Sequence, residues 1–264
     1  MEAIYVVIAG ALGRVGSELV TAVADDPSLR LVGGVEVPGS QRAIVLRDGS
    51  SVPLSSDVDA LLKRTRPRVL VDFTRPDAAM INVRAAFRQG VSPVVGTTGL
   101  TSENLAEIRD LCSSTGVGAV VAPNFAIGAV LLMHFARIAA RYFDHAEIIE
   151  LHHDQKADAP SGTALATARA MRESRGRDLV AAATSKQTLD GTRGGVSGGV
   201  HIHSVRLPGL VAHQEVIFGG LGQTLTLRHD SISRQSFVPG VLLAIKEVVK
   251  RHDFVYGLEG LLGV

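Results

Sequence analysis

The sequence predicts an α/β fold in two lobes, the first α/β and the second α+β. In the first 124 of its 264 residues, short apolar runs alternate with amphipathic stretches. That alternation is typical of a parallel sheet with helices on both sides. After about Asn124, strand-like runs follow one another through short glycine-containing connections, which favours antiparallel pairing.

The first lobe is expected to contain five strands, each marked by an apolar run. These are residues 4–9, 31–35, 69–73, 94–95 and 117–122. The first run is apolar throughout, as expected of a strand buried on both faces. One helix follows it at helical spacing, a second begins near Pro76, and a third is capped by Thr101 or Ser102.

The second lobe is expected to combine helices with a sheet. The expected helices are residues 126–142 and one that begins at Ser161-Gly162-Thr163, and the expected strands are residues 146–151, 201–207, 212–218 and 223–229. Residues 184–199 are rich in Gly and Thr and predict a loop of about sixteen residues, long enough to carry a function. A last helix is expected at residues 237–250, and the pattern leaves open which lobe it joins.

The composition excludes several functional classes. The chain has 27 Lys and Arg against 26 Asp and Glu, a net charge of +1, whereas a dedicated nucleic-acid binder usually carries a basic excess. The single cysteine, Cys112, excludes an intrachain disulfide and a multi-cysteine zinc site.

No segment predicts a membrane span or a signal peptide. The most apolar long segment, residues 126–140, is interrupted by His134 and Arg137 and is too short to cross a bilayer. No basic stretch precedes residues 4–9, and glycine-rich sequence follows them rather than a cleavage site. We therefore expect a cytoplasmic protein without nucleic-acid or membrane partners.

A glycine-rich turn directly follows the first strand and precedes the first helix. Its residues are Gly10, Ala11, Leu12, Gly13, Arg14, Val15 and Gly16. In this context the turn lets a pyrophosphate approach the backbone at a helix N-terminus. Glu36 lies twenty residues after Gly16, where a carboxylate can bind an adenosine ribose. Glu36 favours NADH, while Arg14 and Arg42 leave NADPH possible.

Two further segments follow strands of the first lobe and fit a cofactor site. They are Phe73-Thr74-Arg75, before Pro76, and Gly96-Thr97-Thr98, before Gly99. In an open parallel sheet, ligands bind at the carboxyl ends of the strands. Taken alone, each segment would more often be a simple helix cap.

The densest chemical segment of the chain, residues 150–164, follows a strand of the second lobe. It places His152, His153 and Lys156 within five residues, ahead of the helix start at Gly162 and Thr163. A histidine titrates near neutral pH and can donate a proton, and free N–H groups at a helix start can hold a carboxylate. Because Lys156 would repel a cation and no further ligands lie close by, we expect no metal. The segment predicts a site for a small anion that receives a proton and a hydride.

These motifs together resemble the 4-hydroxy-tetrahydrodipicolinate reductase family, also called dihydrodipicolinate reductases. The resemblance rests on the GxxGR-x-G turn, the FTRP and GTTG segments, Pro123-Asn124-Phe125 and the E-x-HH-x-x-K-x-DAPSGTA segment. It covers essentially the whole chain, and the DAPSGTA segment with its upstream HH-x-x-K is its most specific part. The resemblance implies reduction of 4-hydroxy-tetrahydrodipicolinate to tetrahydrodipicolinate with NADH or NADPH and loss of water, in lysine biosynthesis through diaminopimelate.

The resemblance also implies roles for individual residues. His152 matches the proton donor and Lys156 the catalytic lysine, while His153, Lys156, Gly162 and Thr163 match positions that hold the substrate carboxylates. Gly10 to Gly16 and Glu36 match the dinucleotide site. The region lining the nicotinamide pocket is matched by Phe73, Thr74, Arg75, Gly96, Thr97, Thr98, Pro123, Asn124 and Phe125.

The family fold implies two domains and a homotetramer. A Rossmann-like dinucleotide-binding domain is expected at residues 1–124 and 236–264, and a mixed-sheet domain for substrate binding and tetramerisation at residues 125–235. Two residues depart from the family pattern. Val15 replaces a frequent Met in the glycine turn, and Val37 stands where some members carry Arg, which argues against a strict NADPH preference.

Two other functions fit parts of the sequence. One is a dehydrogenase of another aspartate-derived amino-acid precursor, since a shared first lobe does not set the substrate. The other is a non-catalytic NAD(H)-binding regulator, although no output module is evident. For four histidines in the predicted strands of the second lobe, the pattern indicates no mechanism: His201, His203, His213 and His229.

Overall fold

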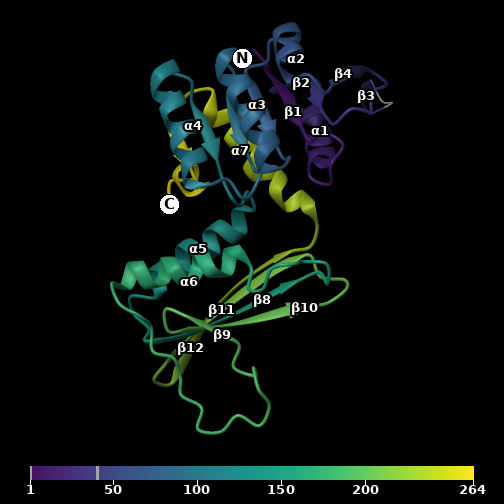
Figure 1. The fold of residues 1–264 in the computed structure, drawn as a ribbon. Coiled ribbons are helices and arrows are strands. Elements are labelled where there is room, and N and C mark those ends of the chain that lie inside the picture. Colours follow the sequence, from purple (N-terminus) through teal and green to yellow (C-terminus); the bar gives the residue numbers. More distant parts are fainter. Residues whose placement is uncertain (1, 40–41) are drawn as a thin grey trace. The chain divides into compact units, whose positions relative to one another are not determined.

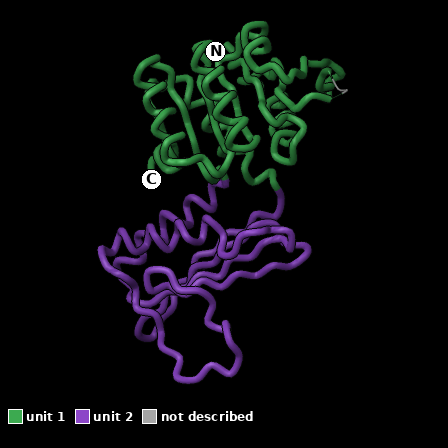
Figure 2. The backbone as a smooth tube through the Cα atoms, viewed as in Figure 1, with its two compact units in different colours: residues 1–125, 234–263 green, residues 126–233, 264 purple. Residues whose placement is uncertain are grey.

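The computed structural model describes residues 2–39 and 42–264. The chain divides into two compact units (Figures 1 and 2). Unit 1 comprises Met1–Phe125 and Arg234–Gly263, and unit 2 comprises Ala126–Ser233 with Val264. The final helix, which the sequence pattern left open and the family resemblance assigned to the dinucleotide-binding domain, belongs to unit 1.

Unit 1 is built on a sheet in which, over the described residues, eight strands follow the order β13-β7-β6-β5-β1-β2-β4-β3. The strands are β1 (Ile4–Ala9), β2 (Leu29–Val35), β3 (Ala43–Val45), β4 (Ser51–Ser55), β5 (Val69–Asp72), β6 (Ser92–Val95), β7 (Ala119–Val121) and β13 (Phe254–Tyr256). Every pairing is parallel except that of β3 with β4. The expected parallel sheet is confirmed.

Helices cover both faces of this sheet. The helices of unit 1 are α1 (Gly16–Asp25), α2 (Val58–Thr65), α3 (Pro76–Arg88), α4 (Ser102–Thr115), α7 (Val238–Val248) and α8 (Glu259–Leu262), with a short 3-10 helix η1 (Arg234–Phe237). On one face, α2, α3 and α4 bury aliphatic side chains against β1, β5, β6 and β7. On the other face α1 and α7 contact each other, and α7 packs on β5, β6 and β7 (Figure 1).

Several short elements of unit 1 were not anticipated. They are β3, β4, α2, β13 and α8, and each has at most eight residues. Helix α2 forms because Asp57 accepts a hydrogen bond from the Ala60 N–H at 2.9 Å and because Leu61 and Leu62 are buried. The three strands lie at or next to the sheet edges, where few apolar residues are needed.

Unit 2 contains a mixed sheet of the order β12-β11-β8-β10-β9 and the helices α5 (Ile127–Ala139) and α6 (Gly162–Arg175). The strands are β8 (His145–His152), β9 (Gly195–Ser197), β10 (Val200–Arg206), β11 (Ala212–Gly220) and β12 (Gln223–Ser231). The two helices and one sheet face enclose a core that includes Ile148, Met171 and Phe218, each fully buried.

One expected pairing in unit 2 is wrong. Strands β11 and β12 are antiparallel as predicted, but β10 does not pair with β11 and instead runs parallel to β8. The central strand β8 pairs with β10 on one edge and with β11 on the other. Short connections favour pairing between strands that follow one another in the chain, whereas here β8, from earlier in the chain, lies between β10 and β11. The expected loop at residues 184–199 is also interrupted, because β9 pairs with β10.

Among the described residues, no helix has both the length and the apolar character needed to cross a membrane.

The cap of α4 supplies a test of the local sequence signals. Thr101 Oγ1 accepts a hydrogen bond from the Asn104 N–H at 3.3 Å, and Asn104 Oδ1 accepts one from the Thr101 N–H at 3.1 Å. We expect Thr101→Ala to lower the free energy of unfolding by about 1 kcal/mol because both hydrogen bonds depend on this geometry. Urea denaturation measures the change. Ser102→Ala, one residue along, serves as the control and should change stability by less than about 0.5 kcal/mol.

Candidate active site

The glycine turn after β1 has a backbone that only glycine fits. Gly10 has a φ of +77°, and a Cβ there would lie 2.5 Å from the Phe73 carbonyl oxygen. A Cβ at Gly16 would lie 1.9 Å from the Gly10 carbonyl oxygen, so α1 could not begin so close to β1. Gly10 and Gly16 therefore let the turn and the start of α1 pack closely against β1, which is the local geometry of a dinucleotide-binding turn.

Glu36 lies beside this turn, immediately after β2. Its carboxylate accepts hydrogen bonds from the Leu12 N–H at 3.1 Å and from the Val37 N–H at 3.0 Å. The turn and the acidic residue, separated by more than twenty residues in sequence, are thus directly connected. This is the arrangement in which a carboxylate can bind ribose hydroxyls next to a phosphate-binding turn.

A pocket of about 440 Å³ in unit 1 brings six of the predicted cofactor residues together. These are Gly10, Gly13, Glu36, Phe73, Thr74 and Arg75. Val37 and Pro38 also line it. Among the described residues that line this pocket, Arg75 is the one lysine or arginine. The other predicted cofactor residues do not line this pocket: Ala11, Leu12, Arg14, Val15, Gly16, Gly96, Thr97, Thr98, Pro123, Asn124 and Phe125.

A buried carboxylate joins the two loops that follow β5 and β6. Asp72 is fully buried, and its Oδ1 accepts hydrogen bonds from Thr74 Oγ1 at 2.8 Å and from Thr97 Oγ1 at 2.6 Å. Its Oδ2 accepts one from Asn82 Nδ2 of α3 at 2.7 Å. Because a buried charge is costly unless several donors surround it, Asp72 fixes the positions of Thr74 and Thr97 relative to each other. The sequence did not indicate this role for Asp72 or Asn82.

The Phe73 ring contacts the Phe125 ring and fills the space beside Gly96, which has no side chain. A Cβ at Gly96 would lie 2.2 Å from the Phe73 ring, so the ring occupies the space that any larger residue would need. The rings of Phe73 and Phe125 are 5.7 Å apart between centroids. The structure therefore brings three of the predicted nicotinamide-pocket residues into contact within unit 1.

In unit 2, His152 is the last residue of β8 and forms a pair with Glu150. Its Nδ1 lies 2.5 Å from Glu150 Oε2, and the Glu150 side chain is completely buried while that of His152 is 16% exposed. Burial lowers the pKa of His152, and the charges of Lys156 and Arg206 lower it further, whereas Glu150 raises it. His152 therefore loses its proton more readily than an ordinary histidine.

Lys156 and the start of α6 lie on the segment that follows His152. The Lys156 ammonium contacts Asp158 Oδ1 at 2.6 Å and is 21% exposed. Ser161 caps α6, with its Oγ accepting from the Ala164 N–H at 3.2 Å. An added Cβ at Gly162 would meet no atom within 4 Å, so the helix start is open at Gly162. Together these residues offer a cation and free N–H groups to a carboxylate.

The four histidines for which the sequence indicated no mechanism have local contacts in unit 2. His203 Nε2 lies 2.8 Å from Glu147 Oε2, and His213 Nδ1 lies 2.7 Å from Asp230 Oδ1. His201 Nδ1 contacts the Arg193 carbonyl at 2.6 Å. His229 packs so closely on α5 that a Cβ at Gly128 would lie 2.4 Å from its ring. These contacts join neighbouring strands, or a strand and a helix or loop.

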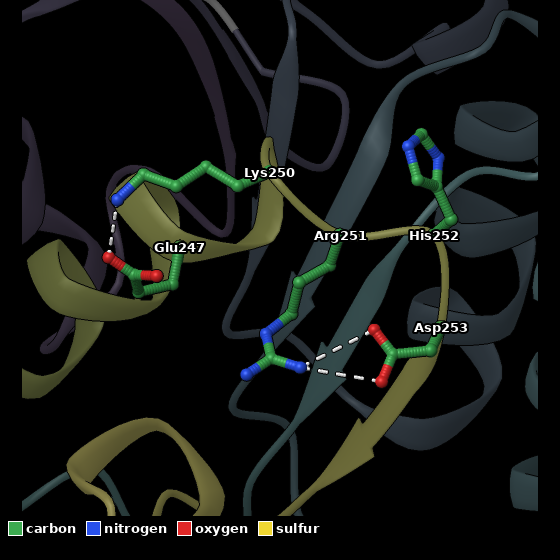
Figure 3. A pocket seen from close by; sticks show the side chains of 5 residues that line it. All are labelled: Glu247, Lys250, Arg251, His252 and Asp253. Carbon is green, nitrogen blue, oxygen red and sulfur yellow. Dashed lines mark hydrogen bonds and ion pairs between the residues drawn. The ribbon is translucent and has the colours of Figure 1, made fainter.

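A second surface pocket, of about 530 Å³, lies at the end of α7 (Figure 3). Its lysine and arginine are each paired with an acid that also lines it: Lys250 with Glu247 at 2.6 Å and Arg251 with Asp253 at 3.4 Å. It contains none of the predicted site residues. Across the described parts of the chain, no group of three or more His, Cys, Asp or Glu is placed to hold a metal ion.

Comparison with known proteins connects both units to one family. Residues 4–125 match the family described as "Dihydrodipicolinate reductase, N-terminus", and residues 128–262 match "Dihydrodipicolinate reductase, C-terminus". A 4-hydroxy-tetrahydrodipicolinate reductase from Dehalococcoides mccartyi is 48% identical over 99% of each chain. One from Moorella thermoacetica is 50% identical over 98% of each chain.

Solved structures agree with these sequence matches. A dipicolinate-bound dihydrodipicolinate reductase from Paenisporosarcina sp. TG-14 has a TM-score of 0.87 and 43% identity, covering 98% of this chain and 99% of that one. An amine dehydrogenase from Mycobacterium smegmatis has a TM-score of 0.68 at 16% identity, covering 98% of this chain and 96% of that one, which shows a shared fold alone.

The Asp72 hydrogen bonds generate a prediction about stability. Thr97→Val keeps the volume of the buried side chain but removes a donor to Asp72 and the acceptor for the Thr74 N–H, which lie 2.6 and 2.8 Å from Thr97 Oγ1. We expect the free energy of unfolding, measured by urea denaturation, to fall by about 1–3 kcal/mol. Thr98→Val changes the exposed neighbour and should leave the midpoint nearly unchanged. Equal effects of the two variants would contradict the role assigned to Thr97.

Proposed function

The chain belongs to the dihydrodipicolinate reductase family, and we propose on that basis that it reduces 4-hydroxy-tetrahydrodipicolinate to tetrahydrodipicolinate. The reaction uses NADH or NADPH, releases water and serves lysine biosynthesis through diaminopimelate. The observation that carries the proposal is the pairing of His152 with the buried Glu150, next to Lys156 and the open start of α6. The matches to both halves of the chain favour this reaction over the other dehydrogenase and the regulator that the sequence left open.

Unit 1 fits the cofactor. The glycine turn, where neighbouring backbone leaves no room for a Cβ at Gly10 or Gly16, would hold the pyrophosphate. Glu36 beside it would accept hydrogen bonds from the adenosine ribose. Phe73, Thr97 and their neighbours would hold the nicotinamide, which supplies the hydride. We assign Pro123, Asn124 and Phe125 to the same region because they follow β7, whose carboxyl end lies at the same sheet edge.

Unit 2 fits the substrate. His153, Lys156, Gly162 and Thr163 would hold the two carboxylates by charge and by N–H groups of the α6 start. His152 would donate the proton that accompanies reduction. The side chain of Lys156 is already oriented by Asp158, so its charge is fixed in place before substrate binds.

We propose further that unit 2 is the tetramerisation domain and that the protein acts in the cytoplasm as a homotetramer. One face of the unit 2 sheet supports this, because α5 and α6 cover only the other face. In β12, six of the nine residues are exposed, which leaves a large sheet area for contact with other copies.

The role of His152 predicts a loss of turnover without loss of cofactor binding. We expect His152→Ala to lower kcat by roughly 10²–10⁴-fold, the usual contribution of a proton donor. The dissociation constant for NADH, measured by fluorescence, should change by less than about twofold because His152 belongs to unit 2. His145→Ala, at the exposed start of the same strand, is the matched control. Wild-type turnover in His152→Ala would refute the assignment.

Glu36 predicts the cofactor preference. Its carboxylate favours ribose hydroxyls and repels a 2′-phosphate, so the protein should prefer NADH. Glu36→Gln keeps the side-chain shape and removes the charge. We expect the ratio of kcat/KM with NADH to kcat/KM with NADPH to fall by roughly tenfold, since a hydrogen bond to a charged group contributes about 1.5–3 kcal/mol. Glu18→Gln on α1 is the control, and an unchanged ratio in Glu36→Gln would show that other groups select the cofactor.

A further inference from the structure

Glu150 is a buried carboxylate in the middle of unit 2, and it is surrounded by donors. Its side chain has no exposed surface. Arg206 of β10 binds it with two nitrogens, Nη1 to Oε2 at 2.9 Å and Nη2 to Oε1 at 2.8 Å, and the Ser161 N–H donates to Oε1 at 3.2 Å. Although burial raises its pKa, hydrogen bonds from Arg206, Ser204 and His152 hold the pKa of Glu150 below its ordinary value. Glu150 is therefore a carboxylate, and its position is fixed from several sides.

A further contact of this carboxylate is with His152. The Nδ1 of His152 lies 2.5 Å from Glu150 Oε2, a distance at which the proton on Nδ1 is donated to the carboxylate. A hydrogen bond at one ring nitrogen decides which nitrogen carries the exchangeable proton. It also holds the ring plane, because Glu150 itself cannot move without breaking its contacts to Arg206 and Ser161.

A buried ion pair alone does not explain the presence of Glu150. Such pairs often contribute little net stability, because removing two charges from water costs about as much as their attraction returns. Glu150 and Arg206 therefore need another reason to occupy this place, and the orientation of His152 supplies one.

We propose that Glu150 is a positioning residue for the proton donor: its carboxylate, fixed by Arg206 and Ser161, binds Nδ1–H of His152 and leaves Nε2 to carry the proton that is transferred. The inference deepens the proposed function and rests on it. In the step, the Nε2–H bond breaks, its electron pair stays on Nε2, and the proton goes to the substrate. Nδ1–H stays bonded to Glu150, which remains a carboxylate, and solvent later returns a proton to Nε2.

The charges around the imidazole give this arrangement a pH signature. Glu150 favours the imidazolium, whereas Lys156, Arg206 and burial disfavour it. Asp158 is paired with Lys156, and its backbone carbonyl accepts from Arg206. A proton donor must be protonated to act, so kcat/KM falls as pH rises through its pKa. Loss of the Glu150 charge lowers that pKa, and the fall then occurs at lower pH.

The test is the variant Glu150→Gln, which keeps the shape of the side chain. We expect kcat near neutral pH to fall by roughly 10-fold to 100-fold, less than the full contribution of the proton donor. The pH at which kcat/KM begins to fall should move down, while the dissociation constant for NADH stays within about twofold. Glu147→Gln is the matched control, since Glu147 also lies on β8 and also pairs with a histidine and an arginine, His203 and Arg193. A folded Glu150→Gln with a wild-type pH profile would overturn the proposal.

A measurement on the unchanged protein decides the matter if Glu150→Gln does not fold. The ¹⁵N chemical shifts of the histidine rings distinguish the two neutral tautomers, and comparison with His152→Gln assigns the signals of His152. We expect the Nδ1–H tautomer, and observation of the Nε2–H tautomer would overturn the proposal. The measurement needs no substrate. A wild-type protein that fails to reduce 4-hydroxy-tetrahydrodipicolinate would therefore contradict the proposed function, while the tautomer still tests the role of Glu150.

Discussion

A parallel sheet buried on both faces leaves the ends of its strands as the place for polar chemistry, and this constraint organises unit 1. The central strands β1, β5 and β6 are almost wholly buried, and their buried side chains are almost all apolar. The polar groups that could act on a ligand come directly after the strands, at Gly10, Glu36, Thr74 and Thr97. Asp72 is the buried acidic residue of these strands, and its three side-chain donors show what a carboxylate requires in that position.

In unit 2 a buried charge lies within the sheet itself and not after the end of a strand, so it needs partners inside the unit. Glu150 on β8 pairs in register with Ser204 on β10 and with Gln214 on β11. Glu150 and Gln214 are buried and so depend on partners from other elements, with Gln214 donating to Thr167 of α6 at 2.8 Å. Helix α6, whose first N–H groups we propose to bind the substrate, is therefore tied to the sheet that carries His152.

Local patterns in the sequence were sufficient for the strands and helices with strong apolar periodicity. The first strand is confirmed at Ile4–Ala9, the helix near Pro76 begins at that residue, and Thr101 caps α4. The short strands at or next to the sheet edges of unit 1 were not predicted, because three to five residues show too little periodicity to mark a strand. The residues of the HH-x-x-K segment could be found because they are close in sequence. Arg206 could not, since it reaches Glu150 across 56 residues through the register of β8 and β10, which no local pattern encodes.

The chain leaves unit 1 after Phe125 and returns to it at Arg234, and this order of segments affects biosynthesis. Strand β7 gains its outer neighbour β13 only when residues 254–256 have been made. Until then β7 itself is the edge strand, and an unpaired edge strand is the kind of surface that pairs with other chains. Unit 2, encoded almost entirely by one continuous segment, is complete earlier. Of the two units, the one whose synthesis starts first is thus the one that is completed last.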